Sequence, residues 1–255
     1  MSSNNTRKYT ELNPRKELKD FVASYWESTN DTDHIQEVTI CPDGYVKLIF
    51  QLQEGRLVRY IMTGLWTKEV EIKIPSGITS YGIRLKVIAP EYILKQDAIS
   101  SFNSVVPLNF DFLDIKNMNF TSFEGVVEQL ETTFLKRLAS HKEIRGNRLR
   151  LSQLLYNTFG DILASEVANQ IYWSQREINR YLNRYLGISL KKYLNIQKCY
   201  RAYLEIREGD FFPEKGFFDQ AHFIREVKKH TGHTPTTLHQ GLNDQFIQLK
   251  NIKKL

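Results

Sequence analysis

The sequence predicts an α+β protein of two domains, in which an N-terminal antiparallel β barrel or sandwich precedes an all-helical domain. In the first half, apolar residues alternate with polar ones, as in half-buried strands. From about residue 121 they recur at steps of three and four, as on one face of a helix. A length of 255 residues fits two domains of ordinary size. We place the first domain at 1–120, a helix and linker at 121–145, the helical domain at 146–240 and a tail at 241–255.

Three segments show the strand pattern most clearly. Apolar residues take every second place at 46–53, 69–74 and 81–87. Turn signals separate these runs, among them Pro42-Asp43-Gly44, Glu54-Gly55 and Pro75-Ser76-Gly77. Short strands at this spacing favour a small barrel or sandwich.

The predicted helix after residue 121 has one apolar face. Thr121 or Ser122 can cap its start, and the polar segment 141–147 is the predicted linker. The helix can pack against its own barrel or against its copy in a second protomer, and the pattern does not separate these two uses. The apolar face consists of Phe123, Val127, Leu130, Phe134 and Leu138.

The two halves differ in charge. Residues 145–255 have a net charge of +8 and residues 1–144 a net charge of −2. This asymmetry favours a polyanion-binding second half, although a basic solvated face would give the same count. No apolar run approaches the length of a membrane helix, and the start has no secretion signal. Cys41 and Cys199 are far apart, as expected of reduced cysteines in a cytoplasmic protein.

A helix with a distinctive polar face is predicted after Ser174. Ser174 and Glu177 have the spacing of a capping box, which marks a helix start. The expected buried face contains Ile178, Tyr181, Leu182 and Tyr185. The opposite face carries side chains that can bind base edges in two places at once or pair with phosphates. These are Gln175, Arg176, Asn179, Arg180, Asn183 and Arg184.

The neighbouring segments complete two helix-turn-helix units. A helix capped by Asp161 is predicted just upstream, and a helix of about 20 residues, or about 30 Å, is predicted between Ser189 and Gly209. Asp219 can cap a further helix. Its outward residues are expected to be Gln220, Ala221, Ile224, Arg225 and Lys228.

These motifs resemble the AraC/XylS family of bacterial transcription regulators. The first unit is similar in Val167-Ala168, in Ser174-x-Arg-x-Ile-x-Arg-Tyr-Leu and in Gly187-x-Ser189. The segment from Gly216 to Lys229, followed by Thr231-Gly232-x-Thr234-Pro235, resembles the family's C-terminal signature. The resemblance covers about residues 148–240 and implies that the outward residues of both helices face DNA. It departs in two places: only 210–215 separates Gly209 from Gly216, and Tyr172 stands where the family prefers glycine.

The first half has a looser resemblance. Cys41-Pro-Asp-Gly-Tyr-Val-Lys-Leu-Ile-Phe50, Thr63-Gly64 and Tyr81-Gly-Ile-Arg84 are similar to an uncharacterised N-terminal domain that precedes such DNA-binding units. The resemblance implies a cupin-like barrel used for sensing or dimerisation. Ligand-binding candidates are Trp26, Trp66, Tyr81 and Arg84, although barrel core explains each of the aromatic residues as well.

Enzymatic function is not expected. Residues 1–140 contain one histidine, His34, and His230-x-x-His233 falls inside the family signature, so we predict no metal site, catalytic residue or cofactor. The resemblance implies a regulator that binds double-stranded DNA. RNA polymerase, a small-molecule effector and a second copy of the chain are further candidate partners, and no membrane association is expected. The alternative is a protein-interaction module that retains a degenerate helix-turn-helix domain.

Overall fold

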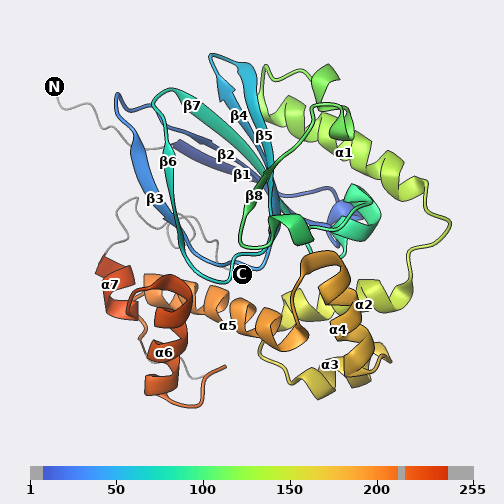
Figure 1. The fold of residues 1–255 in the computed structure, drawn as a ribbon, viewed down its shortest axis with the longest axis vertical. Helices are drawn as coiled ribbons and strands as arrows, with labels where there is room; N and C mark the ends of the chain where they lie inside the picture. The colour runs from blue at the N-terminus through green and yellow to red at the C-terminus, as the bar shows by residue number, and fades with distance from the viewer. Residues whose placement is uncertain (1–7, 212–215, 241–255) are drawn as a thin grey trace.

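The predicted order of a strand-rich part followed by a helical part is confirmed. The structure is a computed structural model and describes residues 8–211 and 216–240. In Figure 1 the strands form the upper part of the molecule, and the helices after residue 145 lie along one end of them.

The strands form two antiparallel sheets. A six-stranded sheet has the order β1-β2-β7-β4-β5-β8, and β3 pairs with β6 in a second sheet. The six-stranded sheet lies between the β3–β6 pair and the helix α1, Phe123–Ala139 (Figure 1). The strand bounds are Lys8–Leu12 (β1), Val22–Thr29 (β2), Gln36–Ile40 (β3), Val46–Gln53 (β4), Arg56–Thr63 (β5), Val70–Ile74 (β6), Ile78–Leu85 (β7) and Val105–Pro107 (β8).

We call the two sheets together the barrel, and helix α1 packs its apolar face against them. Ser122 caps its start by accepting a hydrogen bond from the N–H of Gly125. Phe123 contacts Tyr81 of β7 at a ring separation of 5.3 Å, and Phe134 is fully buried. The exposed side of α1 is polar, with Glu124, Glu128 and Lys136 among its residues. Of the two uses left open for this helix, the structure therefore shows packing on the same chain.

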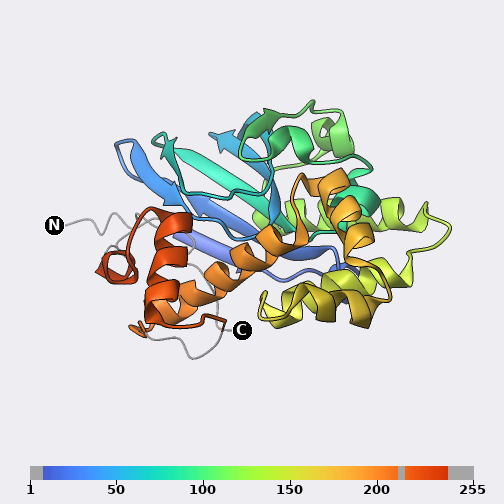
Figure 2. The ribbon, with the colours of Figure 1, turned by 60° about the horizontal axis from the view of Figure 1, so that its bottom comes forward.

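The helices of the second half are arranged around α5. Figure 2 shows α5 crossing beneath the sheet, with α2, α3 and α4 near one end and α6 and α7 near the other. The helix predicted between Ser189 and Gly209 is α5, with Ser189 as its N-terminal cap and Glu208 as its C-terminal cap. The bounds are Gly146–Thr158 (α2), Ala164–Ile171 (α3), Gln175–Leu186 (α4), Leu190–Arg207 (α5), Gln220–Thr231 (α6) and Pro235–Gln240 (α7).

Two local predictions in this half are wrong. Asp161 does not cap α3, because the helix begins at Ala164 and its first-turn Glu166 accepts the N–H of Leu163 at 2.9 Å. The capping carboxylate therefore comes from inside the helix. The predicted linker 141–147 is also too long, since α2 already begins at Gly146.

The six-stranded sheet and the helices share the main apolar core, whereas Val38, Ile74 and Ile78 form a second, small cluster. A single cluster of buried residues runs from the strands into α1 to α7. At the contact between the halves, Tyr45 stacks on Tyr156 of α2 with ring centroids 5.4 Å apart. The hydroxyl of Tyr193 in α5 donates to the carbonyl of Gly44 at 3.1 Å. The helical part is therefore fixed against the barrel by buried contacts.

Cys41 and Cys199 are buried and form no disulfide with each other. Within 8–211 and 216–240, no helix has the length and apolar character needed to cross a membrane.

Candidate nucleic-acid interface and barrel cavity

Helix α4 begins at the predicted capping box. The hydroxyl of Ser174 accepts the N–H of Glu177 at 3.2 Å, and the Glu177 carboxylate accepts the N–H of Ser174 at 2.8 Å. This hydrogen bond from the Ser174 backbone also holds the pKa of Glu177 below its ordinary value. The helix ends at Gly187, whose φ of +70° is the left-handed conformation that favours glycine.

The apolar face of α4 holds the helix in place. Ile178, Tyr181 and Leu182 are buried, and Tyr185 is half-buried. The backbone carbonyl of Tyr185 accepts the N–H of Ala98 at 2.8 Å. Because Ala98 belongs to the segment 90–102 that follows β7, α4 is fixed to the barrel as well as to its helical neighbours.

The outward face of α4 is open to solvent. Gln175, Arg176, Arg180 and Arg184 are all exposed, as is Asn183. No carboxylate in the described part of the chain lies within ion-pair distance of these arginines. A helix face with exposed guanidinium and amide groups can pair with phosphates or with base edges.

Asn179 is placed differently from its predicted partners. It is half-buried, and its side-chain oxygen accepts the N–H of Leu190 at 2.9 Å. Its carbonyl also accepts a hydrogen bond from the Asn183 side chain at 2.8 Å. Asn179 therefore joins α4 to the start of α5, a contact that its place on the polar face did not predict.

The turn before α4 contains the unusual Tyr172. Its φ of +56° lies in the left-handed region, which explains why glycine would suit this position. The ring is 80% exposed, and the guanidinium of Arg150 lies over it at 5.5 Å. The helix-turn-helix geometry is therefore reached with a tyrosine at this turn.

A basic cleft beside α4 was missed by the sequence analysis. It has a volume of about 280 Å³ and brings Arg145 and Arg148 of the α2 region next to Arg180 and Arg184. Arg148 also pairs with Glu91 at 2.6 Å, whereas Arg145 is exposed. Arg145 fell in the predicted linker and Arg148 directly after it, so only their charge could have indicated this role. The cleft widens the cationic surface around α4.

Helix α6 begins at its predicted cap. Asp219 accepts the N–H of His222 at 2.6 Å. Phe223 and Val227 are buried, and Ile224 is half-buried against the core. The four other outward candidates are exposed, namely Gln220, Ala221, Arg225 and Lys228.

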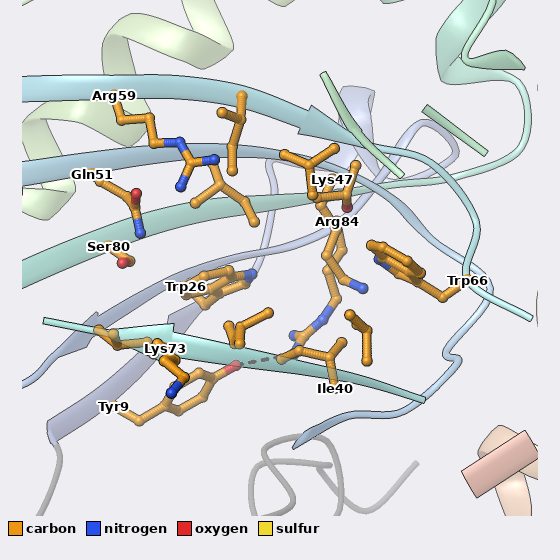
Figure 3. Close-up of a pocket in the computed structure, with 17 residues that line it drawn as sticks. Tyr9, Trp26, Ile40, Lys47, Gln51, Arg59, Trp66, Lys73, Ser80 and Arg84 are labelled. Carbon is orange, nitrogen blue, oxygen red and sulfur yellow. Dashed lines mark hydrogen bonds between the residues drawn. The ribbon is translucent and has the colours of Figure 1, made fainter. Parts of the chain in front are cut away.

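A second candidate site lies inside the barrel. A cavity of about 320 Å³, partly open to solvent, lies between the six-stranded sheet and the β3–β6 pair (Figure 3). Trp26, Trp66 and Arg84 line it, as three of the four predicted ligand candidates. Tyr81 does not, because it lies on the other face of the sheet against Phe123 of α1. Its neighbours in sequence, Ser80 and Gly82, lie on the opposite face of the sheet, and Ser80 lines the cavity.

The described residues offer no metal centre. No group of three His, Cys, Asp or Glu side chains in 8–211 and 216–240 is arranged to hold an ion. His230, one member of the His-x-x-His pair, is buried and lies 3.1 Å from the carbonyl of Thr67 through its Nδ1.

Comparison with known proteins gives one family match and several structural likenesses. Residues 10–107 match a family described as a domain of unknown function, DUF6597. No curated protein matches the chain. ToxT from Vibrio cholerae O395 is 10% identical, with 97% of this chain and 98% of that chain covered and a TM-score of 0.42.

Two further structures are similar at lower scores. Unsaturated fatty acid-bound ToxT from Vibrio cholerae strain SCE256 is 12% identical, with 93% of this chain and 96% of that chain covered and a TM-score of 0.37. The AraC-like transcriptional activator CuxR is 11% identical, with coverage of 77% and 87% and a TM-score of 0.25. The family match spans the barrel strands and none of α2 to α7.

Proposed function

We propose that this chain is a sequence-specific DNA-binding transcription regulator of the AraC type, which acts in the cytoplasm without catalysis or a cofactor. The observation that carries the proposal is the outward face of α4, where Gln175, Arg176 and Arg180 are exposed on a helix fixed at both ends. Such a helix can enter a major groove with its polar side chains facing the base edges.

The second helix proposed to contact DNA, or second reader, is α6, at the far end of α5; the first reader is α4. The 18 residues of α5 span about 27 Å, close to the roughly 34 Å between major-groove faces one turn apart. The proposal assigns Gln220, Ala221, Ile224, Arg225 and Lys228 to the second groove. Arg145 and Arg184, in the basic cleft, are assigned to phosphates.

The cupin-like barrel controls this binding in the proposal. Its cavity is the candidate site for a small-molecule effector, and RNA polymerase is the partner through which bound protein acts on transcription. A homodimer, if formed, uses a surface other than the apolar face of α1, because that face is buried in its own chain.

The test begins by selecting bound duplexes from random DNA and then compares affinities for the selected and random sequences. Arg176→Ala and Arg180→Ala are each expected to cost about 1–3 kcal/mol of base discrimination. Arg56→Ala, in the β4–β5 hairpin, removes one exposed positive charge away from α4 and serves as the matched control. It should leave discrimination unchanged.

The opposite result supports the alternative function. If the wild-type chain binds selected and random duplexes equally and neither arginine variant changes sequence preference, the chain is not a sequence-specific regulator. The helical part is then a protein-interaction module with a degenerate helix-turn-helix fold.

A further inference from the structure

Among the described residues, the lining of the barrel cavity includes four cationic side chains and no carboxylate. Four of its lining residues are Lys47, Arg59, Lys73 and Arg84. Lys47 and Arg84 are buried, with exposed fractions of 6% and 8%. A buried charge is costly unless it is paired, so each of these two cations in the cavity wall is expected to have a counter-ion.

The strand register divides the cavity floor into three rows. The middle row is apolar, with Ile61, Ile49 and Gly82 side by side across β5, β4 and β7. A Cβ on Gly82 would lie 2.0 Å from Cε2 of Trp26, so the missing side chain leaves room for the indole ring on the floor. The rows on either side are polar. One contains Thr63, Lys47, Arg84 and Ser24, and the other contains Arg59, Gln51 and Ser80.

This arrangement fits an amphiphilic molecule. The middle row and the ring of Trp26 give an apolar surface for a flat or chain-like body. Lys47 and Arg84 lie together at one end of that surface, as Figure 3 shows. An anionic group bound there would meet two buried cations in a low-dielectric environment, where charge pairing is stronger than in water.

The internal partner of these cations is Asp43. Its two carboxylate oxygens lie 2.9 and 2.8 Å from Nζ of Lys47, and one of them lies 4.0 Å from Nε of Arg84. Arg84 is also paired with Glu11 at 3.2 Å. Burial lowers the pKa of Lys47, and Asp43 opposes this shift. Asp43 therefore acts as the counter-ion of the cavity cations.

The backbone of the same residue contacts the helical part. The Gln197 side chain of α5 donates to the carbonyl of Asp43 at 3.4 Å. The next carbonyl, of Gly44, accepts from the hydroxyls of Tyr193 and Tyr156 at 3.1 and 3.4 Å. The fit is close, because a Cβ on Gly44 would lie 2.0 Å from Nε2 of Gln197. Residues 43 and 44 therefore contact the cavity cations through the carboxylate of Asp43, and they contact α5 through their two backbone carbonyls.

We propose that the cavity binds a small organic anion with an apolar body, whose acid group pairs with Lys47 and Arg84 and displaces Asp43. The displaced carboxylate shifts the peptide 43–44 and loosens its hydrogen bonds to α5, which connects the two readers. This inference rests on the proposed function for its regulatory meaning, because it names the ligand class and the route of control. A ligand shifts α5 only by its different affinity for the two states of that peptide.

The binding test uses two probes with the same aromatic body. 8-Anilinonaphthalene-1-sulfonate is an anion, and N-phenyl-1-naphthylamine lacks the sulfonate. The chain has three tryptophans, of which Trp26 and Trp66 line the cavity. In a Trp173→Phe background, energy transfer from tryptophan to the probe therefore reports binding near the cavity. The anion should bind at least tenfold more tightly than the amine.

Variants then place the probe. Lys47→Met should remove the preference for the anion, and Asp43→Asn/Lys47→Met removes both charges of the pair in case the single variant fails to fold. Lys191→Met, an exposed lysine of α5, is the matched control and should keep the preference. Ile49→Trp fills the apolar row and should weaken both probes. Equal affinity for the two probes overturns the anion site, and so does unchanged anion binding in the variants without Lys47. The anion site is also overturned if the wild-type chain binds neither this anion nor octanoate.

The route of control is tested by hydrogen–deuterium exchange. Saturation with the anilinonaphthalenesulfonate should speed exchange in α5 at least about twofold, while α1 stays unchanged. In Asp43→Asn the anion should bind without this effect. An unchanged α5 in the wild-type chain overturns the route. Neither measurement uses DNA, so failure here is distinct from failure of the DNA-binding proposal.

Discussion

The two helix-turn-helix units carry similar outward faces on different supports. Around α4 the structure places α2, α3, the start of α5 and the barrel segment 90–102. Around α6 it places α5 and the short α7, and no helix occurs among the described residues of 208–219. The shortened interval predicted from the sequence is therefore real in the part that the structure describes.

The comparison teaches that a helix with an exposed polar face owes its position to its neighbours rather than to its own sequence. Both helices have an N-terminal cap and a buried apolar face. Helix α4 is joined to the start of the next helix by a half-buried side chain, Asn179, and to the barrel through the backbone of Ala98, whereas α6 contacts the barrel through the side chain of His230. We therefore expect the first unit to unfold with the whole chain and the second to open locally.

The largest expected difference between the units is at two glycines. Gly160 precedes α3 with φ +74°, and a Cβ there would lie 2.1 Å from the carbonyl oxygen of Leu194 in α5. Gly216 precedes α6 with φ +86°, but its nearest neighbour would be the Lys198 side chain at 3.8 Å. Gly160→Ala should cost about 3 kcal/mol or more, because strain and a backbone clash combine. Gly216→Ala should cost about 1–2 kcal/mol from strain alone.

Urea unfolding followed by circular dichroism measures the cost at Gly160, and amide exchange in α6 measures the cost at Gly216. The Gly160 variant should unfold at a lower urea midpoint with an unchanged slope. If the two variants shift the midpoint equally, the first unit is no more tightly held than the second.

Removing the N-terminal caps of α4 and α6 is expected to reveal a smaller difference between the two units. Ser174→Ala and Asp219→Ala each remove one capping hydrogen bond, worth about 1 kcal/mol. The loss at Ser174 should appear in the global urea midpoint. The loss at Asp219 should leave that midpoint unchanged and speed amide exchange in α6 about fivefold. A lowered global midpoint for the Asp219 variant would show that α6 unfolds with the core.

The sequence predicted those features that depend on near neighbours. The capping box of α4, the caps of α1, α5 and α6 and the strand at 46–53 all follow from residues a few positions apart. The fold class followed from the same periodicities. The first outward face was also visible, except for Asn179, because its hydrogen bond to Leu190 depends on where the next helix starts.

Features set by distant contacts were not predictable. The assignment of Tyr81 to a ligand site failed because alternation fixes two faces of a strand without showing which one α1 covers. The contact of Asp43 and Gly44 with Gln197 and Tyr193 joins residues about 150 positions apart. Local pattern gives no information on such a pair.

The smallest predicted effect concerns the contact between α6 and the barrel. His230, near the end of α6, is 6% exposed, and its Nδ1 lies 3.1 Å from the carbonyl of Thr67. Burial lowers the pKa of His230, although Glu226 and the Thr67 carbonyl oppose the shift. The folded chain therefore favours the neutral ring, and the unfolded chain takes up a proton more readily. The resulting stability is complete above the unfolded value of about 6.5 and is lost as the pH falls from there toward the lower folded value.

His230→Asn isolates this contribution, because the amide nitrogen of asparagine can take the place of Nδ1 and does not titrate. Five other histidines are common to both chains, so only the difference between them reports on His230. Between pH 7.5 and pH 5.5 the wild-type chain should lose more stability than the variant, because only the wild-type chain takes up a proton at this position on unfolding. Amide exchange in α6 should show the loss before the global midpoint does. If both chains lose stability equally, the contact between α6 and Thr67 does not hold a neutral histidine, and the second unit is fixed to the barrel by other means.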